Sequence, residues 1–122
     1  MNKTVSVAPM MDCTDKHENY FLSLISKNIQ LYTEMIVANA IIKGDRKKLL
    51  SFKSIPNHVT LQIGGSNPKE LAEACKISQD YGYKEINLNL GCPSKKVQKN
   101  KFGACLMQEP ELVGQCIEAM TK

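Results

Sequence analysis

The chain has 122 residues, of which 43% are hydrophobic and 23% are charged. These proportions are ordinary for a globular domain and exclude a mostly disordered or low-complexity chain. The formal net charge of +4 is weak evidence for an anionic partner. We find neither a signal peptide nor an apolar run of ~18 residues that would span a membrane, so we expect a cytoplasmic protein without membrane contact.

Five cysteines are present, and their number and spacing argue against two common roles. An odd count without a secretory signal disfavours a disulfide framework. No pair has the C-x-x-C spacing, so a structural zinc site is not expected. We expect no other metal site. Cys75 and Cys116 fall within helical apolar patterns and are expected in the core. The other three are Cys13, Cys92 and Cys105.

The first half of the chain reads as two strands with helices after them. A strand is expected at residues 5–8. Asp15 and Glu18 have the spacing of a capping box, and apolar residues recur after them at helical spacing. These apolar residues are Tyr20, Phe21, Leu24 and Ile25. The further expected elements are a second strand at residues 31–35, a loop or short helix at 36–42, and another short helix capped by Asp45.

The second half repeats this alternation twice. A third strand is expected at residues 58–63 and a fourth at 85–90, while Pro68 and Pro110 stand where proline can open a helix. Strand and helix thus alternate four times, which predicts a parallel sheet with helices outside it, in one α/β domain spanning residues 1–122. The expected inner faces of the last two helices are Leu71, Ala74, Cys75 and Ser78, and then Leu112, Val113, Cys116, Ile117 and Met120.

The predicted strands have one apolar and one polar face. Side chains alternate across a strand, so Gln62 lies opposite the apolar residues 59, 61 and 63. In a barrel the apolar face meets the helices and the polar face points inward. Glu34, Gln62 and Asn89 would then point inward near the C-terminal ends of three strands, where barrel enzymes place catalytic groups. Ordinary polarity of strand ends next to solvent is the alternative.

A cysteine motif follows the fourth predicted strand. In Gly91-Cys92-Pro93 the glycine permits a sharp turn and the proline stiffens the following backbone, which would hold the thiol at the mouth of the sheet. Four lysines come next, with no acidic residue among them. A structural loop thiol and a solvated loop are the alternatives when these features are taken alone. The lysines are Lys95, Lys96, Lys99 and Lys101.

Several segments together resemble one enzyme family. The segment NLNLGCPSKKVQKNKFGACLM resembles the active-site segment of the tRNA-dihydrouridine synthases, and VAPMMDCTDKH resembles their first strand and loop. LYTEM and LQIGGSNPKELAEA match in the same order, so the resemblance covers nearly the whole chain; it is closest to the subgroup called tRNA-dihydrouridine synthase A. It implies the N-terminal half of a flavin-binding (β/α)8 TIM barrel, with about four β/α units.

The resemblance also implies a reaction. Members of this family bind FMN, take electrons from NADPH and reduce the C5–C6 double bond of a uracil in the D-loop of tRNA. Thiols are mostly protonated at neutral pH, which suits the general acid that gives C5 its proton. The implied residues are Cys92 as proton donor, Pro9, Met10, Met11 and Gln62 at the flavin, and Asn89 at the uridine. The four lysines then become candidates for contacts to tRNA phosphates.

Two features depart from the family pattern. Cys13 stands where the family usually has tryptophan. A complete barrel needs at least ~200 residues, so its second half, with the phosphate anchor of the flavin, lies outside these residues and we expect little activity from the chain alone. Besides tRNA, the expected partner is a complementary C-terminal half or a second copy that pairs the open sheet edges. Alternatives are a flavin oxidoreductase of the dihydroorotate dehydrogenase type acting on a free pyrimidine, and a non-catalytic half-barrel remnant or interaction module.

Overall fold

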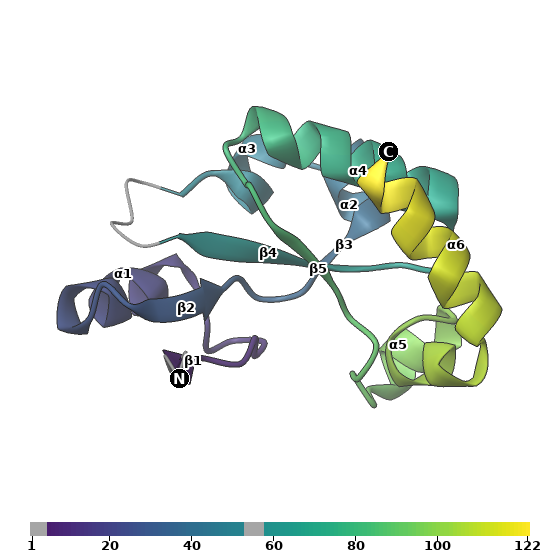
Figure 1. The fold of residues 1–122 in the computed structure, drawn as a ribbon, viewed down its shortest axis with the longest axis horizontal. Coiled ribbons are helices and arrows are strands. Elements are labelled where there is room, and N and C mark those ends of the chain that lie inside the picture. Colours follow the sequence, from purple (N-terminus) through teal and green to yellow (C-terminus); the bar gives the residue numbers. More distant parts are fainter. Residues whose placement is uncertain (1–4, 53–57) are drawn as a thin grey trace.

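The computed structural model describes residues 5–52 and 58–122, whose elements are labelled in Figure 1. The strands are β1 (Val5–Ser6), β2 (Ile29–Tyr32), β3 (Ile36–Val37), β4 (Val59–Gly64) and β5 (Ile86–Leu88). The helices are α1 (Lys16–Ile25), α2 (Ala38–Lys43), α3 (Arg46–Leu50), α4 (Pro68–Asp80), α5 (Lys95–Lys99), the 3-10 helix η1 (Gly103–Gln108) and α6 (Pro110–Thr121).

The sheet is parallel throughout the described residues. β1 pairs with β2, β2 pairs with β4, and β5 pairs with the other edge of β4. Helices follow β1, the β2–β3 segment, β4 and β5 in turn. The predicted α/β fold with about four β/α units is therefore confirmed.

The prediction of one continuous second strand at residues 31–35 is wrong. The chain forms β2, leaves the ladder, and then forms β3 against the same neighbour, β4. Leu31 lies opposite Val59, whereas Ile36 lies opposite Ile63. The β2–β3 segment therefore holds one residue more than the stretch of β4 beside it. One extra residue interrupts a ladder and bends the strand, as in a β-bulge.

The apolar core lies between β4 and the helices on one face of the sheet. Leu61 and Ile63 of β4 are fully buried, in one cluster with Ile41 of α2 and Leu71 of α4. Figure 1 shows α2 and α4 on this side, with α6 crossing beside α4. All four residues predicted for the inner face of α4 are buried. Since the odd-numbered residues of β4 face the helices, Gln62 faces away from them, as predicted.

Side chains cap α1 and α3 where the sequence placed their beginnings. Asp15 accepts hydrogen bonds from the N–H groups of His17 and Glu18, both at 2.9 Å. Its own N–H donates to the carbonyl of Cys13 instead of to a Glu18 carboxylate, so half of the predicted capping box forms. Asp45 caps α3 as predicted. A side-chain cap satisfies backbone donors that have no partner within the helix.

Helix α1 forms as predicted, but it turns a polar face to the sheet. Asn19 and Ser23 are its buried residues. The Asn19 side-chain amide donates to the carbonyls of Tyr32 at 2.9 Å and of Thr14 at 3.2 Å, which fixes the helix against the end of β2. The apolar residues that indicated the helix lie on its outer side. Their exposed fractions are 50% for Tyr20, 60% for Phe21, 63% for Leu24 and 62% for Ile25.

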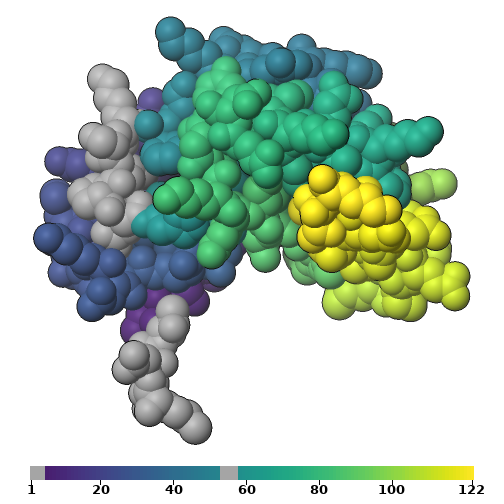
Figure 2. Space-filling model, turned by 45° about the horizontal axis from the view of Figure 1, so that its top comes forward, coloured from purple at the N-terminus to yellow at the C-terminus, as the bar shows by residue number. Residues whose placement is uncertain are grey.

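The C-terminal part of the chain differs from the sequence prediction in two respects. The lysine-rich stretch forms the short helix α5, and an unpredicted 3-10 helix, η1, follows it. In α6 Cys116 is fully buried, while Ile117, predicted on the inner face, is 43% exposed. The adjacent residue lies about 100° further round a helix, so both cannot face α4 equally. Figure 2 shows α6 and the segment around α1 at opposite ends of the molecule.

No helix formed by residues 5–52 or 58–122 is long and apolar enough to cross a membrane.

Candidate active site

Three amide side chains form a hydrogen-bonded row on the sheet face opposite the helices. The Gln62 Nε2 atom donates to Asn87 Oδ1 at 2.7 Å, and the Asn89 Nδ2 atom donates to Gln62 Oε1 at 2.9 Å. Gln62 is 7% exposed and lies directly across the ladder from Asn87. The prediction that Gln62 and Asn89 point to the same side is therefore confirmed.

A second polar row lies nearer the N-terminal ends of the strands. Gln30 Nε2 donates to Thr60 Oγ1 at 2.8 Å, and the Thr60 hydroxyl donates to Glu85 Oε2 at 3.0 Å. Glu85 also lies 3.4 Å from His58 Nε2. The inner face of this sheet is thus polar in two successive rows, whereas its outer face is apolar.

The backbone of Cys92 is held from both sides. Its N–H donates to Asn89 Oδ1 at 3.0 Å, and its carbonyl accepts from the N–H of Ala104 at 3.0 Å. Gly103 has a positive φ of 71°, and a Cβ there would stand 2.7 Å from the Cys92 carbonyl oxygen. The side chain of Cys92 is half-buried at the end of β5.

Gly91 does not have the role predicted for it, which was to permit a sharp turn before Cys92. Gly91 is not among the described residues with positive φ, so its turn does not require glycine. A Cβ at Gly91 would meet nothing within 4 Å. The backbone beside Cys92 therefore borders open space, and the conformation that requires glycine is at Gly103 instead.

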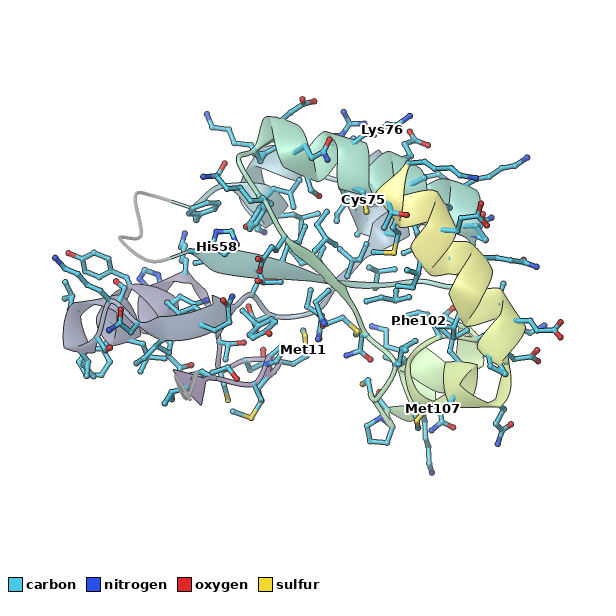
Figure 3. All side chains as sticks on the ribbon, viewed as in Figure 1. Met11, His58, Cys75, Lys76, Phe102 and Met107 are labelled. Carbon is cyan, nitrogen blue, oxygen red and sulfur yellow. The ribbon has the colours of Figure 1, made fainter. Side chains whose placement is uncertain are left out.

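A small apolar cluster supports the segment after Cys92. Val97, Phe102 and Leu106 are buried together, and Figure 3 labels Phe102 beside α5. The ring of Phe102 also lies against Gly64 at the end of β4. The four lysines of this segment are all exposed, and no salt bridge joins them to an acidic group within the described parts of the chain. They form a positively charged surface next to Cys92 in the sequence.

The loop after β1 is fixed by a buried threonine. Thr14 is 1% exposed, and its hydroxyl lies 2.9 Å from the N–H of Met10. The N–H of Asp12 donates to Glu34 Oε1 at 2.6 Å, so Glu34 anchors this loop to the β2–β3 segment. Met10 and Met11 themselves are 51% and 55% exposed, and Figure 3 shows Met11 at the side of the sheet away from α4.

The structure brings together one part of the predicted site. Asn89 is hydrogen-bonded both to the Gln62 side chain and to the backbone of Cys92, and so links the two. No hydrogen bond between described residues joins them to the loop of Pro9, Met10 and Met11. A cavity of about 500 Å³ is lined by Met11 and Glu34, but it does not include Cys92.

Sequence reasoning assigned no role to Asn87, Thr14 or Gly103. The alternation along the fourth strand puts Asn87 on the same face as Asn89, but it does not indicate the contact to Gln62. The other two depend on contacts between segments that the sequence does not display.

Two other cysteines are unsuited to chemistry. Burial in the apolar core raises the pKa of the Cys75 thiol to about 11 and also raises the pKa of Cys116. Such thiols stay protonated at neutral pH and are shielded from reagents. Both were predicted to be core residues, and their exposed fractions of 5% and 0% confirm it.

Comparison with known proteins identifies relatives along nearly the whole chain. A family model described as Dihydrouridine synthase (Dus) matches residues 6–122. The chain is 57% identical over 118 residues to the tRNA-dihydrouridine(20/20a) synthase of Synechocystis sp., and 51% and 47% identical over 120 residues to those of Shewanella oneidensis and Pseudomonas aeruginosa. These matches cover 97%, 98% and 98% of the chain.

The same matches cover 35%, 36% and 36% of the three relatives. The chain thus spans about a third of the length of the curated relatives it matches, and its parallel half-barrel is an N-terminal part of a TIM barrel. Because the family model extends over residues 6–122, the chain belongs to the dihydrouridine synthase family.

Proposed function

We propose that this chain forms the cysteine-bearing part of a tRNA-dihydrouridine synthase, an oxidoreductase that reduces the C5–C6 bond of a uracil in the tRNA D-loop. The observation that carries the proposal is the hydrogen-bonded link from Gln62 through Asn89 to the backbone of Cys92, at the C-terminal ends of β4 and β5. Barrel enzymes carry out their chemistry at this end of the strands.

The residues at this end fit a flavin ring. Gln62 uses one amide proton and one oxygen lone pair in the amide row, so one donor and one acceptor remain for the pyrimidine edge of FMN. The open space beside Gly91 leaves room for a flat ligand, and Pro9, Met10 and Met11 are proposed as a further apolar contact. When bound, FMN reduced by NADPH would supply the hydride for the uracil.

Cys92 would hold and deliver the proton. Reduction adds a hydride to C6 of the uracil and a proton to C5. The Cys92 thiol gives that proton to C5 and recovers one from water afterwards. Its backbone is fixed through Asn89 and Ala104, which would hold the Cα atom that carries the thiol in one place while the base is bound.

Asn89 is proposed to contact the uridine, and its geometry limits how. Its Oδ1 atom accepts from the N–H groups of Gly91 and Cys92, at 3.2 and 3.0 Å. One Nδ2 proton is donated to Gln62. The remaining Nδ2 proton is the group available to a ligand, so Asn89 would donate to a uracil carbonyl oxygen.

The partner is proposed to be tRNA, in the cytoplasm. A uracil must leave the RNA stack to reach such a site, and the lysines after Cys92 would contact the phosphates beside it. Removing these charges should reduce the salt dependence of tRNA binding, because each phosphate contact releases counterions.

A completed barrel tests the proposal. The 122 residues continued by the C-terminal part of the Synechocystis relative, here termed the completed chain, should form dihydrouridine in unmodified tRNA with FMN and NADPH. Cys92→Ala should abolish dihydrouridine formation but leave reduction of FMN by NADPH largely intact. Cys105→Ala makes the same chemical change in the same segment and should leave both reactions unchanged. Equal loss of both reactions in Cys92→Ala would show a structural role, and activity on free uridine without tRNA would contradict the assigned substrate.

A further inference from the structure

The amide row has one direction, which the backbone sets. The N–H groups of Gly91 and Cys92 can only donate, and both point to the same side-chain atom of Asn89. That atom must be the oxygen, so the nitrogen of Asn89 faces Gln62. The atom of Gln62 that it meets must then be oxygen. This chain of donors and acceptors removes the ambiguity between amide oxygen and nitrogen.

The row ends on Asn87. With its oxygen turned to Asn89, Gln62 directs its nitrogen at Asn87, and the Asn87 atom at 2.7 Å must be an acceptor. Gln62 and Asn87 are register partners on adjacent strands, so the contact is built into the ladder of β4 and β5. The Gln62 amide is therefore held at its nitrogen by Asn87 and at its oxygen by Asn89, and the residue is 7% exposed.

We infer that Asn87 is a positioning residue, which clamps the Gln62 amide in the orientation that the proposed flavin contact requires. The inference rests on the proposed function, because it assigns the purpose of the clamp to FMN. With Asn87 in place, the free donor and the free acceptor of Gln62 keep fixed positions. Without that acceptor, one anchor remains, and the Gln62 amide can swing about the contact to Asn89.

A set of variants of the completed chain isolates this role. Asn87→Asp keeps an acceptor oxygen at the same place, whereas Asn87→Leu has similar size and no acceptor. Loss of one buried hydrogen bond corresponds to roughly 10-fold weaker binding, so Asn87→Leu should raise the Kd for FMN about 10-fold while Asn87→Asp stays within about 3-fold. Asn39→Leu, on the exposed side of α2, is the matched control and should bind FMN like the parent. If Asn87→Leu folds poorly, Asn87→Ala removes the acceptor without its bulk.

A double-substitution cycle separates positioning from general stability. In a Gln62→Ala background, Asn87→Leu should weaken FMN binding less than about 2-fold further, since the clamped group is already absent. An undiminished effect in that background, or equal effects of Asn87→Leu and Asn87→Asp, would overturn the inference.

A measurement without FMN tests the clamp on Gln62 independently of the proposed function. Side-chain NMR of the completed chain should show slow hydrogen exchange of the Gln62 amide protons in the parent and in Asn87→Asp, and faster exchange in Asn87→Leu. Unchanged exchange in Asn87→Leu contradicts the clamp even where FMN binds. Failure of the parent to bind FMN, with the exchange pattern as expected, contradicts the flavin role of Gln62 and leaves Asn87 with a structural role alone.

Discussion

The position of Cys92 depends on a glycine eleven residues further along the chain. Gly103 has a left-handed backbone and touches the carbonyl of Cys92, and the next residue, Ala104, donates its N–H to that carbonyl. A Cβ at Gly103 would also stand 2.6 Å from Cγ1 of the buried Val97. The close approach therefore needs a residue without a side chain.

Substitution of Gly103 should lower the stability of the fold, whereas substitution of a glycine within a helix should not. A side chain at φ 71° costs about 1–2 kcal/mol, and the two contacts below 3 Å add to it, so Gly103→Ala should destabilise the completed chain by at least ~2 kcal/mol. Gly114→Ala, in α6 with nothing within 4 Å, should stabilise it by about 0.5–1 kcal/mol. Urea unfolding measures both values. Equal effects of the two substitutions would mean that the loop adjusts freely.

At the scale of elements, α1 depends on its cap. Hydrogen bonds from the backbone N–H groups of Glu18 and His17 lower the pKa of the Asp15 carboxyl below its ordinary value. A carboxyl with a lowered pKa in the folded state stabilises that state above the pKa of the unfolded chain. The contribution is lost as the pH falls through the lowered value.

The cap predicts a pH-dependent difference between two variants. Asp15→Ala should cost about 1 kcal/mol at neutral pH, while Asp15→Asn, which can also cap, should cost less. The stability difference between the parent and Asp15→Asn should shrink once the pH falls below the ordinary Asp pKa of about 3.9. Chemical unfolding of the completed chain at pH 7 and at about pH 3 tests this. Asp80→Asn removes a charge at the end of α4 without removing a cap and serves as the control. A stability difference between the parent and Asp15→Asn that stays constant with pH would contradict the prediction.

Elements were predictable where local chemistry and burial agree. Pro68 and the apolar stripe of α4 belong to a helix that is buried on the face its sequence indicates. The break between β2 and β3 was not predictable, because one extra residue beside β4 leaves no mark in the composition of residues 31–35. The apolar spacing in α1 indicated the helix but not the face that meets the sheet. Hydrogen bonds of Asn19, not apolar contacts, decide that face.

In the candidate site, too, some features were predictable from the sequence and others were not. Alternation along β4 and β5 correctly placed Gln62 and Asn89 on one face, since a strand has only two faces. The support of Cys92 by Gly103, and the anchoring of the Met10 loop by Thr14 and Glu34, depend on tertiary contacts. Such contacts follow from the fold and cannot be read from spacing.

At the scale of the whole molecule, the two strands at the ends of the sheet, β1 and β5, each pair with only one neighbour among the described residues. β1 pairs with β2 and β5 pairs with β4. Near β1, α1 exposes an apolar face that includes Phe21 and Leu24, and Val5 of β1 is 62% exposed. Unpaired edges and apolar faces of this kind promote association. We propose that the C-terminal part of a barrel covers them, because the match to the Synechocystis relative covers 35% of that protein.

A complementation experiment follows from these exposed surfaces. The C-terminal part of the Synechocystis relative, expressed as a separate chain, should copurify with the 122 residues and restore dihydrouridine formation. Phe21→Glu places a charge on the apolar face of α1 and should weaken copurification. Lys76→Glu, on the exposed side of α4 (Figure 3), changes charge away from that face and should not. Copurification unaffected by Phe21→Glu would show that the halves meet elsewhere.

The 122 residues alone should show little or no synthase activity. Gln62 and Cys92 are proposed to form part of a flavin pocket, but barrel enzymes usually bind phosphate through loops after strands seven and eight, which the described strands do not include. Loss of two or three charge-assisted hydrogen bonds, each worth about 1.5–3 kcal/mol, would weaken FMN binding by several orders of magnitude. Assay of the chain with FMN, NADPH and unmodified tRNA, with dihydrouridine measured directly, tests this. Clear multiple turnover by the chain alone would overturn the prediction and mean that the half-barrel builds its phosphate site in another way, of which dimerisation is one example. A stable flavin-free dimer would favour a non-catalytic interaction module.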